Sequence, residues 1–322
     1  MVSPLMKAVL FDRFGGPEVL YVGRVPRPEP ASGEVLVRVA AFSVNSSELM
    51  VRTGRARFMT GRKFPMRTGL DFTGEIEALG TGATGVAVGD RVWGVLGRGS
   101  WFRGAAEFLA VPTDGLGRIP DELDPVAAAA LPATGSTALT ALRDKAALRP
   151  GERLLVRGAA GGVGNAAVQL GKAYGAEVTA LARGANLDFV RELGADHAVD
   201  HRTVSPAELG RFDVVLDSVG TDLRTYRRLL APGGRMVAVA IDSRHLAACL
   251  FTVAASTVHG RGRIRFFSSS PDRALLDAVA DEVRKGRLRP AVDRVFPLAE
   301  TGAAHRALEA GGVRGKYVVR VD

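Results

Sequence analysis

The stretch LLVRGAAGGVGNAAVQLGKAYGAEVTALAR, residues 154–183, decides the fold. Its apolar run at 154–156 is typical of a buried parallel strand, and a second apolar run follows at 177–182. Between them lie a glycine-rich turn and a segment of helical composition that Gly175 ends. This order predicts one βαβ unit with a right-handed crossover.

The glycine-rich turn predicts dinucleotide binding. It reads A-x-G-x-x-G at Ala159, Gly161 and Gly164. Glycines let the backbone approach a pyrophosphate, and the helix that follows offers free N–H groups and the positive end of its dipole. The motif is weak by itself, but here it stands between a strand and a helix, the context that confirms it. The alternative is a glycine-rich turn without a ligand.

The end of the second strand indicates which dinucleotide binds. An NAD site usually places Asp or Glu there to accept a hydrogen bond from the ribose 2′-OH. This chain has Arg183, followed by Gly184 and Asn186. A guanidinium group cannot accept that hydrogen bond, but it suits a 2′-phosphate. The sequence therefore favours NADPH over NADH, and the alternative is a solvated surface arginine.

Length and composition are those of an ordinary globular protein. A chain of 322 residues is long enough for two domains, and its 47% hydrophobic and 24% charged content is typical of soluble proteins. The net charge of +9 comes mostly from arginines spread over the chain, since only 6 of the 43 basic residues are lysines. Without a nucleic-acid motif, this charge does not predict a nucleic-acid partner.

The sequence also lacks the marks of secretion and of membrane insertion. Cys249 is the only cysteine, so no disulfide framework is expected. The first residues contain no long apolar leader, and no run of eighteen apolar residues occurs. We therefore expect a cytoplasmic protein without a membrane partner.

Short strands separated by glycine turns predict a β-rich domain before residue 126. They are expected at 7–11, 34–45, 75–79, 90–96 and 105–111. Asp124 is placed to cap a helix at 126–130, and a second helix is expected to run to about residue 147.

Strands and helices alternate after residue 183 and predict a doubly wound sheet of about six strands. Its further strands are expected at 198–199, 213–218, 236–241 and 263–267, and its further helices at 187–193 and 222–231. An amphipathic helix at 272–285 and strands at 292–296 and 317–321 follow, and the strands are expected to return to the first domain.

The order of these parts resembles the medium-chain dehydrogenase/reductases, and several stretches are similar to their zinc-free quinone oxidoreductase (zeta-crystallin-like) branch. These stretches lie at 6–20, 69–94, 158–178, 191–200 and 314–319. The resemblance implies an α/β protein. A GroES-like, β-rich catalytic domain is expected at 1–126 and 268–322, and a doubly wound Rossmann domain at 127–267. It also suggests Met6 as the native start.

The resemblance bears on zinc as well. Zinc-dependent members carry a cysteine, then Gly-His-Glu, then a lobe with four cysteines. Here the first place falls near Asn45 and Ser46, the histidine is replaced by Leu70, and the lobe is absent. We expect His197 and His201 to be solvated or structural, because the strand-like residues between them do not give helical ligand spacing. No zinc site is therefore expected.

The loss of zinc limits the chemistry. Nothing obvious would polarise an isolated carbonyl, whereas a quinone or an enone delocalises the charge that a hydride brings. We therefore expect an NADPH-dependent reductase of quinones or activated alkenes. One alternative is an enoyl-thioester reductase, which Met50, in the place of a tyrosine of relatives, disfavours. The other is a non-catalytic NADPH-binding protein with a structural or regulatory role.

Two candidate catalytic residues follow from the resemblance. Asn45 matches an asparagine that could donate to the substrate carbonyl or to the nicotinamide ribose, or it could simply close the end of a strand. Thr137 matches a position beside the nicotinamide, and the alternative is a hydroxyl that bonds back to its own helix.

The cofactor residues implied by the resemblance lie along the Rossmann segment and near the C-terminus. Phe266 and Phe267 could otherwise be core residues, and Lys316 could otherwise be a solvated lysine at a strand end. The set comprises Gly161, Gly162 and Val163 at the pyrophosphate, Arg183 and Asn186 at the 2′ position, Ser218, Val219 and Gly220 beside the adenosine, Ala240 and Ile241 beside the nicotinamide, Phe266, Phe267 and Ser268 at the carboxamide, and Lys316 near the phosphates or ribose.

A basic run departs from the relatives. Residues 52–67 contain Arg52, Arg55, Arg57, Arg62, Lys63 and Arg67 and no acid. Since the run follows the Asn45 motif, it suggests an anionic small-molecule substrate that is steered by charge, and the alternative is a solvated loop. A homodimer would be usual for such relatives.

Overall fold

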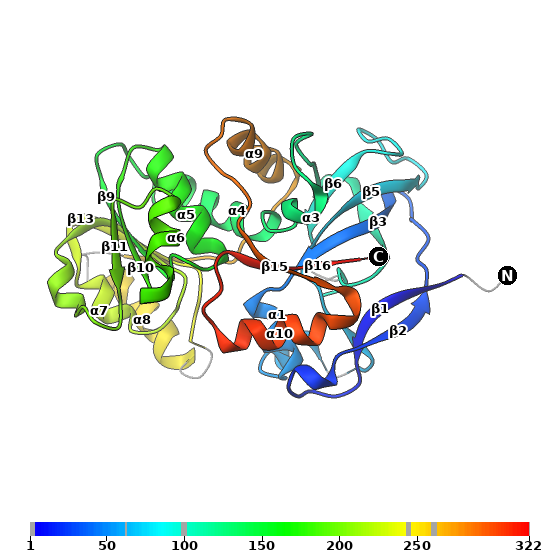
Figure 1. Ribbon diagram of the computed structural model, residues 1–322, viewed down its shortest axis with the longest axis horizontal. Coiled ribbons are helices and arrows are strands. Elements are labelled where there is room, and N and C mark those ends of the chain that lie inside the picture. Colours follow the sequence, from blue (N-terminus) through cyan, green and yellow to red (C-terminus); the bar gives the residue numbers. More distant parts are fainter. Residues whose placement is uncertain (1–3, 62, 98–101, 243–245, 259–262, 322) are drawn as a thin grey trace. The chain divides into compact units, whose positions relative to one another are not determined.

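The computed structural model describes residues 4–61, 63–97, 102–242, 246–258 and 263–321. The chain divides into two compact units, coloured by sequence in Figure 1. The β-rich unit comprises Met1–Ala133, Ser270–Lys285 and Pro290–Asp322, and the parallel-sheet unit comprises Thr134–Ser269 and Gly286–Arg289.

The first boundary between the units lies after Ala133, beyond the expected residue 126. The reason is helix α3 (Pro125–Ala128), which Asp124 caps as expected and which packs on the β-rich unit. The Thr73 hydroxyl donates to the Pro125 carbonyl over 2.8 Å. A second departure is Gly286–Arg289, which belongs to the parallel-sheet unit because the Gln169 side chain bonds both the N–H and the carbonyl of Arg289.

The parallel-sheet unit has the predicted doubly wound topology. Its six strands lie in the order β11-β10-β9-β12-β13-β14, and every neighbouring pair is parallel. In chain order this is 3-2-1-4-5-6, the arrangement that binds dinucleotides where the strand order reverses. The strands are β9 (Arg153–Arg157), β10 (Glu177–Ala182), β11 (His197–Asp200), β12 (Phe212–Asp217), β13 (Leu230–Ala238) and β14 (Ile264–Phe266).

Helices connect these strands, and most of them match the expectation. The helix expected at 222–231 ends earlier, at Arg227, because residue 230 already pairs with Phe212 as the first residue of β13. Helix α8 was not expected, since its nearly uniform apolar composition has no helical period. The helices are α4 (Pro132–Leu139), a π-helix (Thr140–Lys145), α5 (Gly162–Ala173), α6 (Leu187–Glu192), α7 (Leu223–Arg227) and α8 (Leu246–Val258).

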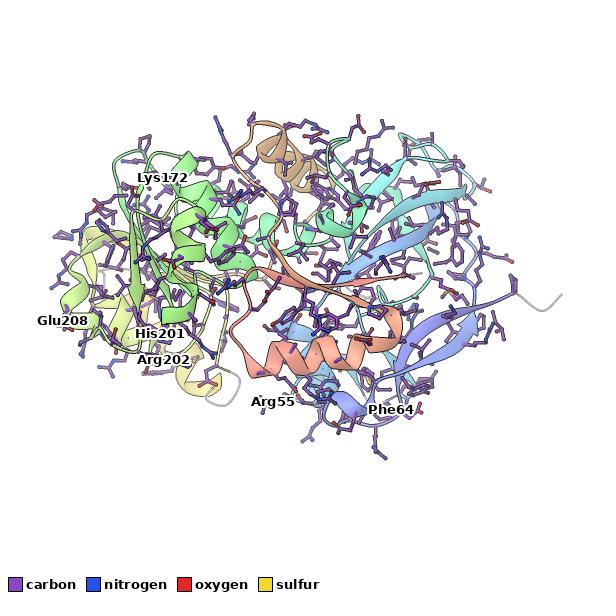
Figure 2. The ribbon with its side chains drawn as sticks, in the orientation of Figure 1. Arg55, Phe64, Lys172, His201, Arg202 and Glu208 are labelled. Atoms are coloured by element: carbon purple, nitrogen blue, oxygen red, sulfur yellow. The ribbon has the colours of Figure 1, made fainter. Side chains whose placement is uncertain are left out.

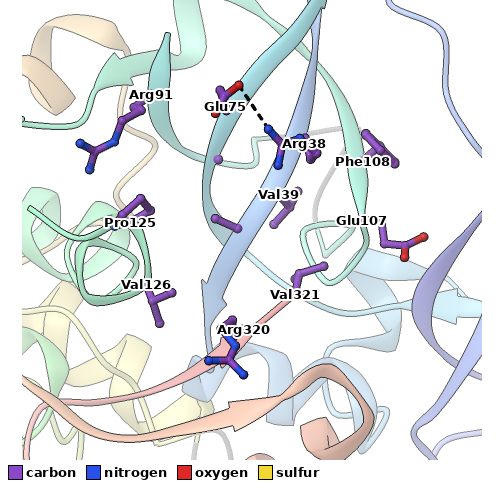
Figure 3. A pocket seen from close by; sticks show the side chains of 12 residues that line it. Arg38, Val39, Glu75, Arg91, Glu107, Phe108, Pro125, Val126, Arg320 and Val321 are labelled. Atoms are coloured by element: carbon purple, nitrogen blue, oxygen red, sulfur yellow. Dashed lines mark ion pairs between the residues drawn. The ribbon is translucent and has the colours of Figure 1, made fainter. Parts of the chain in front are cut away.

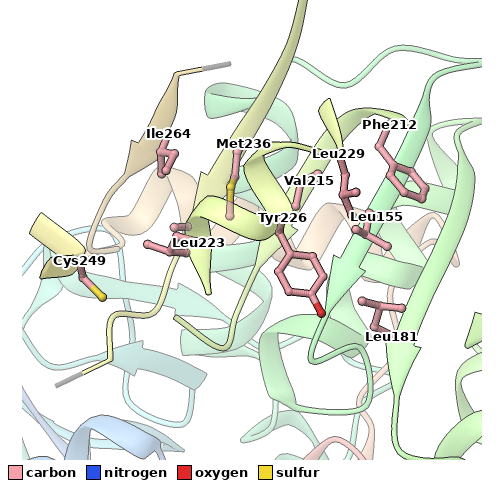
Figure 4. Packing of buried hydrophobic residues seen from close by; sticks show 11 residues of the cluster. Leu155, Leu181, Phe212, Val215, Leu223, Tyr226, Leu229, Met236, Cys249 and Ile264 are labelled. Carbon is pink, nitrogen blue, oxygen red and sulfur yellow. The ribbon is translucent and has the colours of Figure 1, made fainter. Parts of the chain in front are cut away.

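One hydrophobic cluster fills this unit between the sheet and helices α7 and α8 (Figure 4). Residues of β9, β10, β12, β13 and β14 supply it, and helices α7 and α8 add apolar side chains of their own. The members are Leu155, Leu181, Phe212, Val215, Leu223, Tyr226, Leu229, Met236, Ala238, Cys249 and Ile264. The buried core holds the sheet rigid beneath the loops at its carboxyl edge.

The β-rich unit contains two sheets. The larger has the order β15-β16-β3-β5-β6-β8, with β7 also paired to β3, and the smaller has the order β2-β1-β4. The strands are β1 (Leu5–Phe11), β2 (Tyr21–Pro26), β3 (Glu34–Ser43), β4 (Met66–Arg67), β5 (Asp71–Leu79), β6 (Arg91–Val95), β7 (Phe108–Pro112), β8 (Leu116–Arg118), β15 (Val292–Pro297) and β16 (Lys316–Arg320).

The C-terminal strands return to the β-rich unit as predicted. β16 lies antiparallel beside β3, with Val318 opposite Ser43. Helix α10 was not expected; it packs on β15 and β16 and contacts α1. The helices of this unit are α1 (Ser46–Arg52), α2 (Arg57–Thr60), α3, α9 (Arg273–Arg284) and α10 (Thr301–Ala310). None of the helices in the described ranges is long and apolar enough to cross a membrane.

Candidate active site

The glycine-rich turn fits a pyrophosphate. Helix α5 begins at Gly162, and no hydrogen bond among the described residues uses the backbone N–H of Gly162, Val163 or Gly164. A Cβ on Gly164 would stand 2.1 Å from the Gly158 carbonyl oxygen, so only glycine allows the first turn of α5 to pack so closely. These residues therefore offer free donors at a helix N-terminus, as a bound dinucleotide requires.

The expected 2′ position lies at the end of β10. Arg183 is half-buried there, and its guanidinium group has no acidic partner among the residues that the structure describes. Asn186 is buried, and its N–H donates to the Arg183 carbonyl over 2.8 Å.

An acid on the neighbouring strand was missed. Asp200 ends β11, and its Oδ2 would lie 2.7 Å from a Cβ on Gly184. Asp200 pairs in register with Ala182, the residue before Arg183. An acidic residue at the end of the strand next to β10 was therefore the sequence signal that could have predicted this neighbour. His201 follows it and is exposed (Figure 2), and His197, also exposed, approaches Glu177 to 2.9 Å.

The loops after β12 and β13 meet at the carboxyl edge of the sheet. A Cβ on Gly220 would lie 2.8 Å from the backbone of Ile241 and 2.9 Å from that of Ala240. Val219 is 43% exposed beside them. The structure therefore brings together the residues expected beside the adenosine, Ser218, Val219 and Gly220, and those expected beside the nicotinamide, Ala240 and Ile241.

Phe266 ends β14, and Phe267 and Ser268 follow it. Phe266 is 41% exposed, Phe267 is half-buried and Ser268 is exposed. The core alternative is therefore wrong for Phe266. Thr137 lies half-buried in α4. The roles of these residues toward the cofactor stay predictions.

Asn45 links β3 to α1 in the β-rich unit. It is the N-cap residue of α1, and both its backbone N–H and its Nδ2 lie 3.1 Å from Glu48 Oε1. Its Oδ1 accepts a hydrogen bond of 2.7 Å from Lys316 Nζ. The side chain thus closes the strand end, and its amide is held between a carboxylate and an ammonium group.

Two buried carboxylates surround this amide. Glu48 Oε2 accepts from the Thr68 hydroxyl over 2.6 Å and from the Gly69 N–H over 2.8 Å. Asp71 accepts from the N–H and the hydroxyl of Ser43 over 2.8 and 2.6 Å. Burial raises the pKa of the Asp71 carboxyl, and Lys316 and Ser43 oppose that rise.

Lys316 supplies the cation of this cluster. It is only 5% exposed, so the alternative of a solvated lysine is wrong. Its Nζ donates to the Val44 carbonyl and to Asn45 Oδ1, each over 2.7 Å. Burial lowers the pKa of the Lys316 ammonium group, and Asp71 and Glu48 act against that shift. Its expected contact with the cofactor stays a prediction.

Sequence reasoning missed His305, which α10 places against this cluster. The side chain is fully buried, and Nε2 lies 3.9 Å from Glu48 Oε2. Among the residues that the structure describes, neither ring nitrogen has a hydrogen-bond partner. Burial and, to a lesser degree, the nearby Arg52 charge lower the pKa of His305 to about 3, while Glu309 opposes them. No local pattern around His305 predicts such a neighbour, because α10 is far from Glu48 in sequence.

The basic run divides into internal and exposed parts. Arg52 is buried, donates to the Gly15 carbonyl over 3.0 Å and forms an ion pair with Glu309, so it is not part of a solvated loop. Arg55 (Figure 2), Arg57 and Lys63 are exposed. Arg67 is half-buried, and Arg62 lies outside the described residues.

The donor set around Asn45 does not fit a catalytic zinc ion. The side chain of Leu70 has no ligating atom, and every carboxylate oxygen of Glu48 and Asp71 already accepts hydrogen bonds. Within the described ranges, no group of three or more His, Cys, Asp or Glu side chains is placed to hold a metal ion.

A cavity of about 400 Å³ lies elsewhere in the β-rich unit, over β3, β5 and α3 (Figure 3). Its wall includes Arg38, Arg91 and Arg320, and Arg38 pairs with Glu75 over 3.2 Å. None of the predicted site residues lines it. We therefore do not assign it to the active site.

A doubly wound sheet with a glycine-rich turn at its switch point, carried with a β-rich GroES-like unit, defines the class of dinucleotide-dependent oxidoreductases. Comparison with known families agrees. Residues 31–121 match the alcohol dehydrogenase GroES-like domain, and residues 193–319 match the zinc-binding dehydrogenase domain.

Individual relatives narrow the class. The chain is 32% identical to the chloroplast envelope quinone oxidoreductase homolog of Arabidopsis thaliana, over 99% of both proteins. It is 31% identical to a mitochondrial NAD(P)H oxidoreductase of Mus musculus, over 99% of this chain and 90% of that protein. The solved quinone oxidoreductase of Coxiella burnetii superposes with a TM-score of 0.90 at 31% identity, covering 99% of this chain and 100% of that one.

The chain belongs to the medium-chain dehydrogenase/reductase superfamily, in its quinone oxidoreductase-like branch. It is an NAD(P)H-dependent oxidoreductase of that type.

Proposed function

We propose that this enzyme is an NADPH-dependent, zinc-independent reductase that transfers hydride to a quinone or to an alkene activated by a carbonyl group. The observation that carries the proposal is the buried cluster around Asn45, which consists of hydrogen-bonding groups and lacks a metal-ligand set. An isolated ketone needs a Lewis acid or a positioned general acid to accept hydride, whereas a conjugated acceptor spreads the charge onto its oxygen.

Some residues of this chain would bind NADPH, and others would stabilise the charge that develops on the substrate. Bound NADPH would supply the hydride. The free N–H groups at the start of α5 would hold its pyrophosphate, and Arg183 would contact the 2′-phosphate. The Asn45 amide and the Lys316 ammonium group would stabilise the negative charge that develops on the substrate oxygen. Both are hydrogen-bond donors within the buried cluster.

The test is oxidation of NADPH and NADH by metal-free protein with five acceptors: a benzoquinone, a 2-alkenal, an enone, a crotonyl thioester and a simple ketone. We expect turnover of NADPH with the quinone or the enone and none with the ketone. Turnover confined to the thioester would instead favour an enoyl-thioester reductase. Binding of NADPH without turnover of any acceptor would favour a non-catalytic role.

Replacing Arg183 by alanine should weaken the use of NADPH. A lost charge-assisted hydrogen bond to the 2′-phosphate corresponds to a fall of about 10- to 100-fold in kcat/KM for NADPH, with little change for NADH. Arg191→Ala is the matched control, because Arg191 is exposed and pairs with Asp188 on the surface of α6. Equal loss with both cofactors would contradict a 2′-phosphate contact.

We also propose that the acceptor is anionic, because Arg55, Arg57 and Lys63 form an exposed basic stretch without an acid in its sequence. Raising the ionic strength from about 20 to about 300 mM should lower kcat/KM several-fold for a carboxylate-bearing enone and leave a neutral enone unchanged. The double variant Arg55→Glu, Arg57→Glu should remove this difference, whereas Lys285→Glu, at the exposed end of α9, should not. The same salt response for both acceptors would exclude steering.

A further inference from the structure

Arg157 is the last residue of β9, directly before the glycine-rich turn, and its guanidinium group is buried. In register it lies beside Asp217, the last residue of β12. Its Nη1 forms an ion pair with the Asp217 carboxylate and donates to the Thr221 carbonyl over 2.6 Å. The guanidinium carbon also lies 3.6 Å from the centre of the Tyr226 ring. One side chain thus contacts the last residue of β12 and two residues of the segment that follows it.

Asp217, which is paired with Arg157, also binds the loop after β12. Its Oδ1 accepts hydrogen bonds from the N–H groups of Val219 and Gly220, over 2.8 and 2.7 Å. From the same loop, the Ser218 hydroxyl donates to the Arg157 carbonyl over 2.7 Å. The loop is therefore tied to Arg157 through both its side chain and its main chain.

The tied loops are close-packed. A Cβ on Gly158 would stand 2.6 Å from the Ser218 hydroxyl oxygen, and a Cβ on Gly220 would stand 2.8 Å from the backbone of Ile241. A shift of the loop after β12 would therefore move its neighbours. These loops stand at the carboxyl ends of parallel strands around the reversal of strand order, which is where a dinucleotide binds.

A buried ion pair is weak support for stability by itself, because apolar residues of similar volume often stabilise as well. The arginine also fixes the positions of its partners, because its planar guanidinium group donates to several acceptors in fixed directions. We propose that Arg157 is a positioning residue for the cofactor: with Asp217 it fixes the loop after β12 against the glycine-rich turn in the arrangement that accepts NADPH. This inference rests on the proposed use of NADPH and deepens it.

The test compares variants that keep the unit folded. Arg157→Lys keeps the charge and loses the fork, and the double variant Arg157→Met, Asp217→Asn leaves no buried charge unpaired. Arg153→Met is the matched control on the same strand, because Arg153 is 45% exposed and lies 3.8 Å from Glu177. For each variant the Kd for NADPH is measured by titration of NADPH fluorescence, together with Tm and with kcat and KM for the acceptor at saturating NADPH.

We expect the Kd for NADPH to rise about tenfold or more in both Arg157 variants, while Tm, kcat at saturation and the KM of the acceptor change little. The Arg153 control should bind NADPH like the unmodified protein. Unchanged binding in the double variant, or a loss that follows Tm alone, would overturn the inference and leave the proposed function standing. Failure of the unmodified protein to bind NADPH would overturn both.

Discussion

Replacing Lys316 with methionine should lower the free energy of unfolding by about 3–5 kcal/mol, the usual effect of removing one partner from a buried charge cluster. The ammonium group donates to Asn45 Oδ1 and to the Val44 carbonyl, and it lies near the carboxylates of Asp71 and Glu48. Methionine fills a similar volume but leaves both carboxylates buried without this cation. Urea unfolding at neutral pH, followed by tryptophan fluorescence, measures the loss.

Two further variants separate charge from packing. Lys7→Met is the matched control, since Lys7 is about half exposed and its Nζ stands 3.8 Å from Glu107, so we expect a change of less than about 1 kcal/mol. The double variant Lys316→Met, Asp71→Asn should recover part of the stability, because it removes one of the two unpaired charges. A midpoint for Lys316→Met equal to that of the unmodified protein would show that Lys316 does not hold the cluster together.

The same substitution should affect activity in a defined way. Without the ammonium group, Asn45 Oδ1 loses its donor, and the amide is then held only through Nδ2, which faces Glu48 Oε1 and the Ser43 carbonyl. We expect kcat/KM for the acceptor to fall about tenfold or more in protein that is still folded.

Acidification should destabilise the protein through His305 by about 2 kcal/mol between about pH 7.5 and about pH 5. The pKa of His305 is about 3 in the folded protein, against 6.5 for an ordinary histidine. The folded state therefore keeps the ring neutral while the unfolded state takes up a proton, so stability is lost as the pH falls below 6.5 and the loss is complete near 3. Urea unfolding at several pH values gives the slope.

His305→Gln isolates this contribution. The stability of the variant should fall less steeply with falling pH, because the difference in bound protons between the unfolded and folded states is smaller by up to one. The pKa of Asp71 is shifted in the opposite direction, but Asp71 is present in both proteins and does not affect the comparison. His197→Gln is the control, because the His197 ring is exposed beside Glu177. If His305→Gln and the unmodified protein have the same slope, the His305 ring is not held neutral by burial.

Much of the fold was readable from local patterns in the chain. The apolar runs and glycines at 154–183 predict β9, α5 and β10, and Gly175 takes the positive φ of +81° that ends α5. Asp124 accepts from the N–H groups of Val126 and Ala127 as an N-cap should. These features depend on neighbours a few residues away, so a single sequence suffices. Where periodicity is absent, as in the apolar α8, the prediction failed.

The state of the site residues was decided by tertiary structure. The sequence by itself determined the class of protein, the glycine-rich turn and the arginine that follows β10. It could not show that Lys316 is buried against Asn45, 271 residues away, because that contact exists only when β16 pairs with β3. Nor could it show that His305 lies beside Glu48 or that Arg157 meets Asp217. Burial, pKa and hydrogen-bond partners depend on which segments the fold brings together, and the local sequence does not encode that.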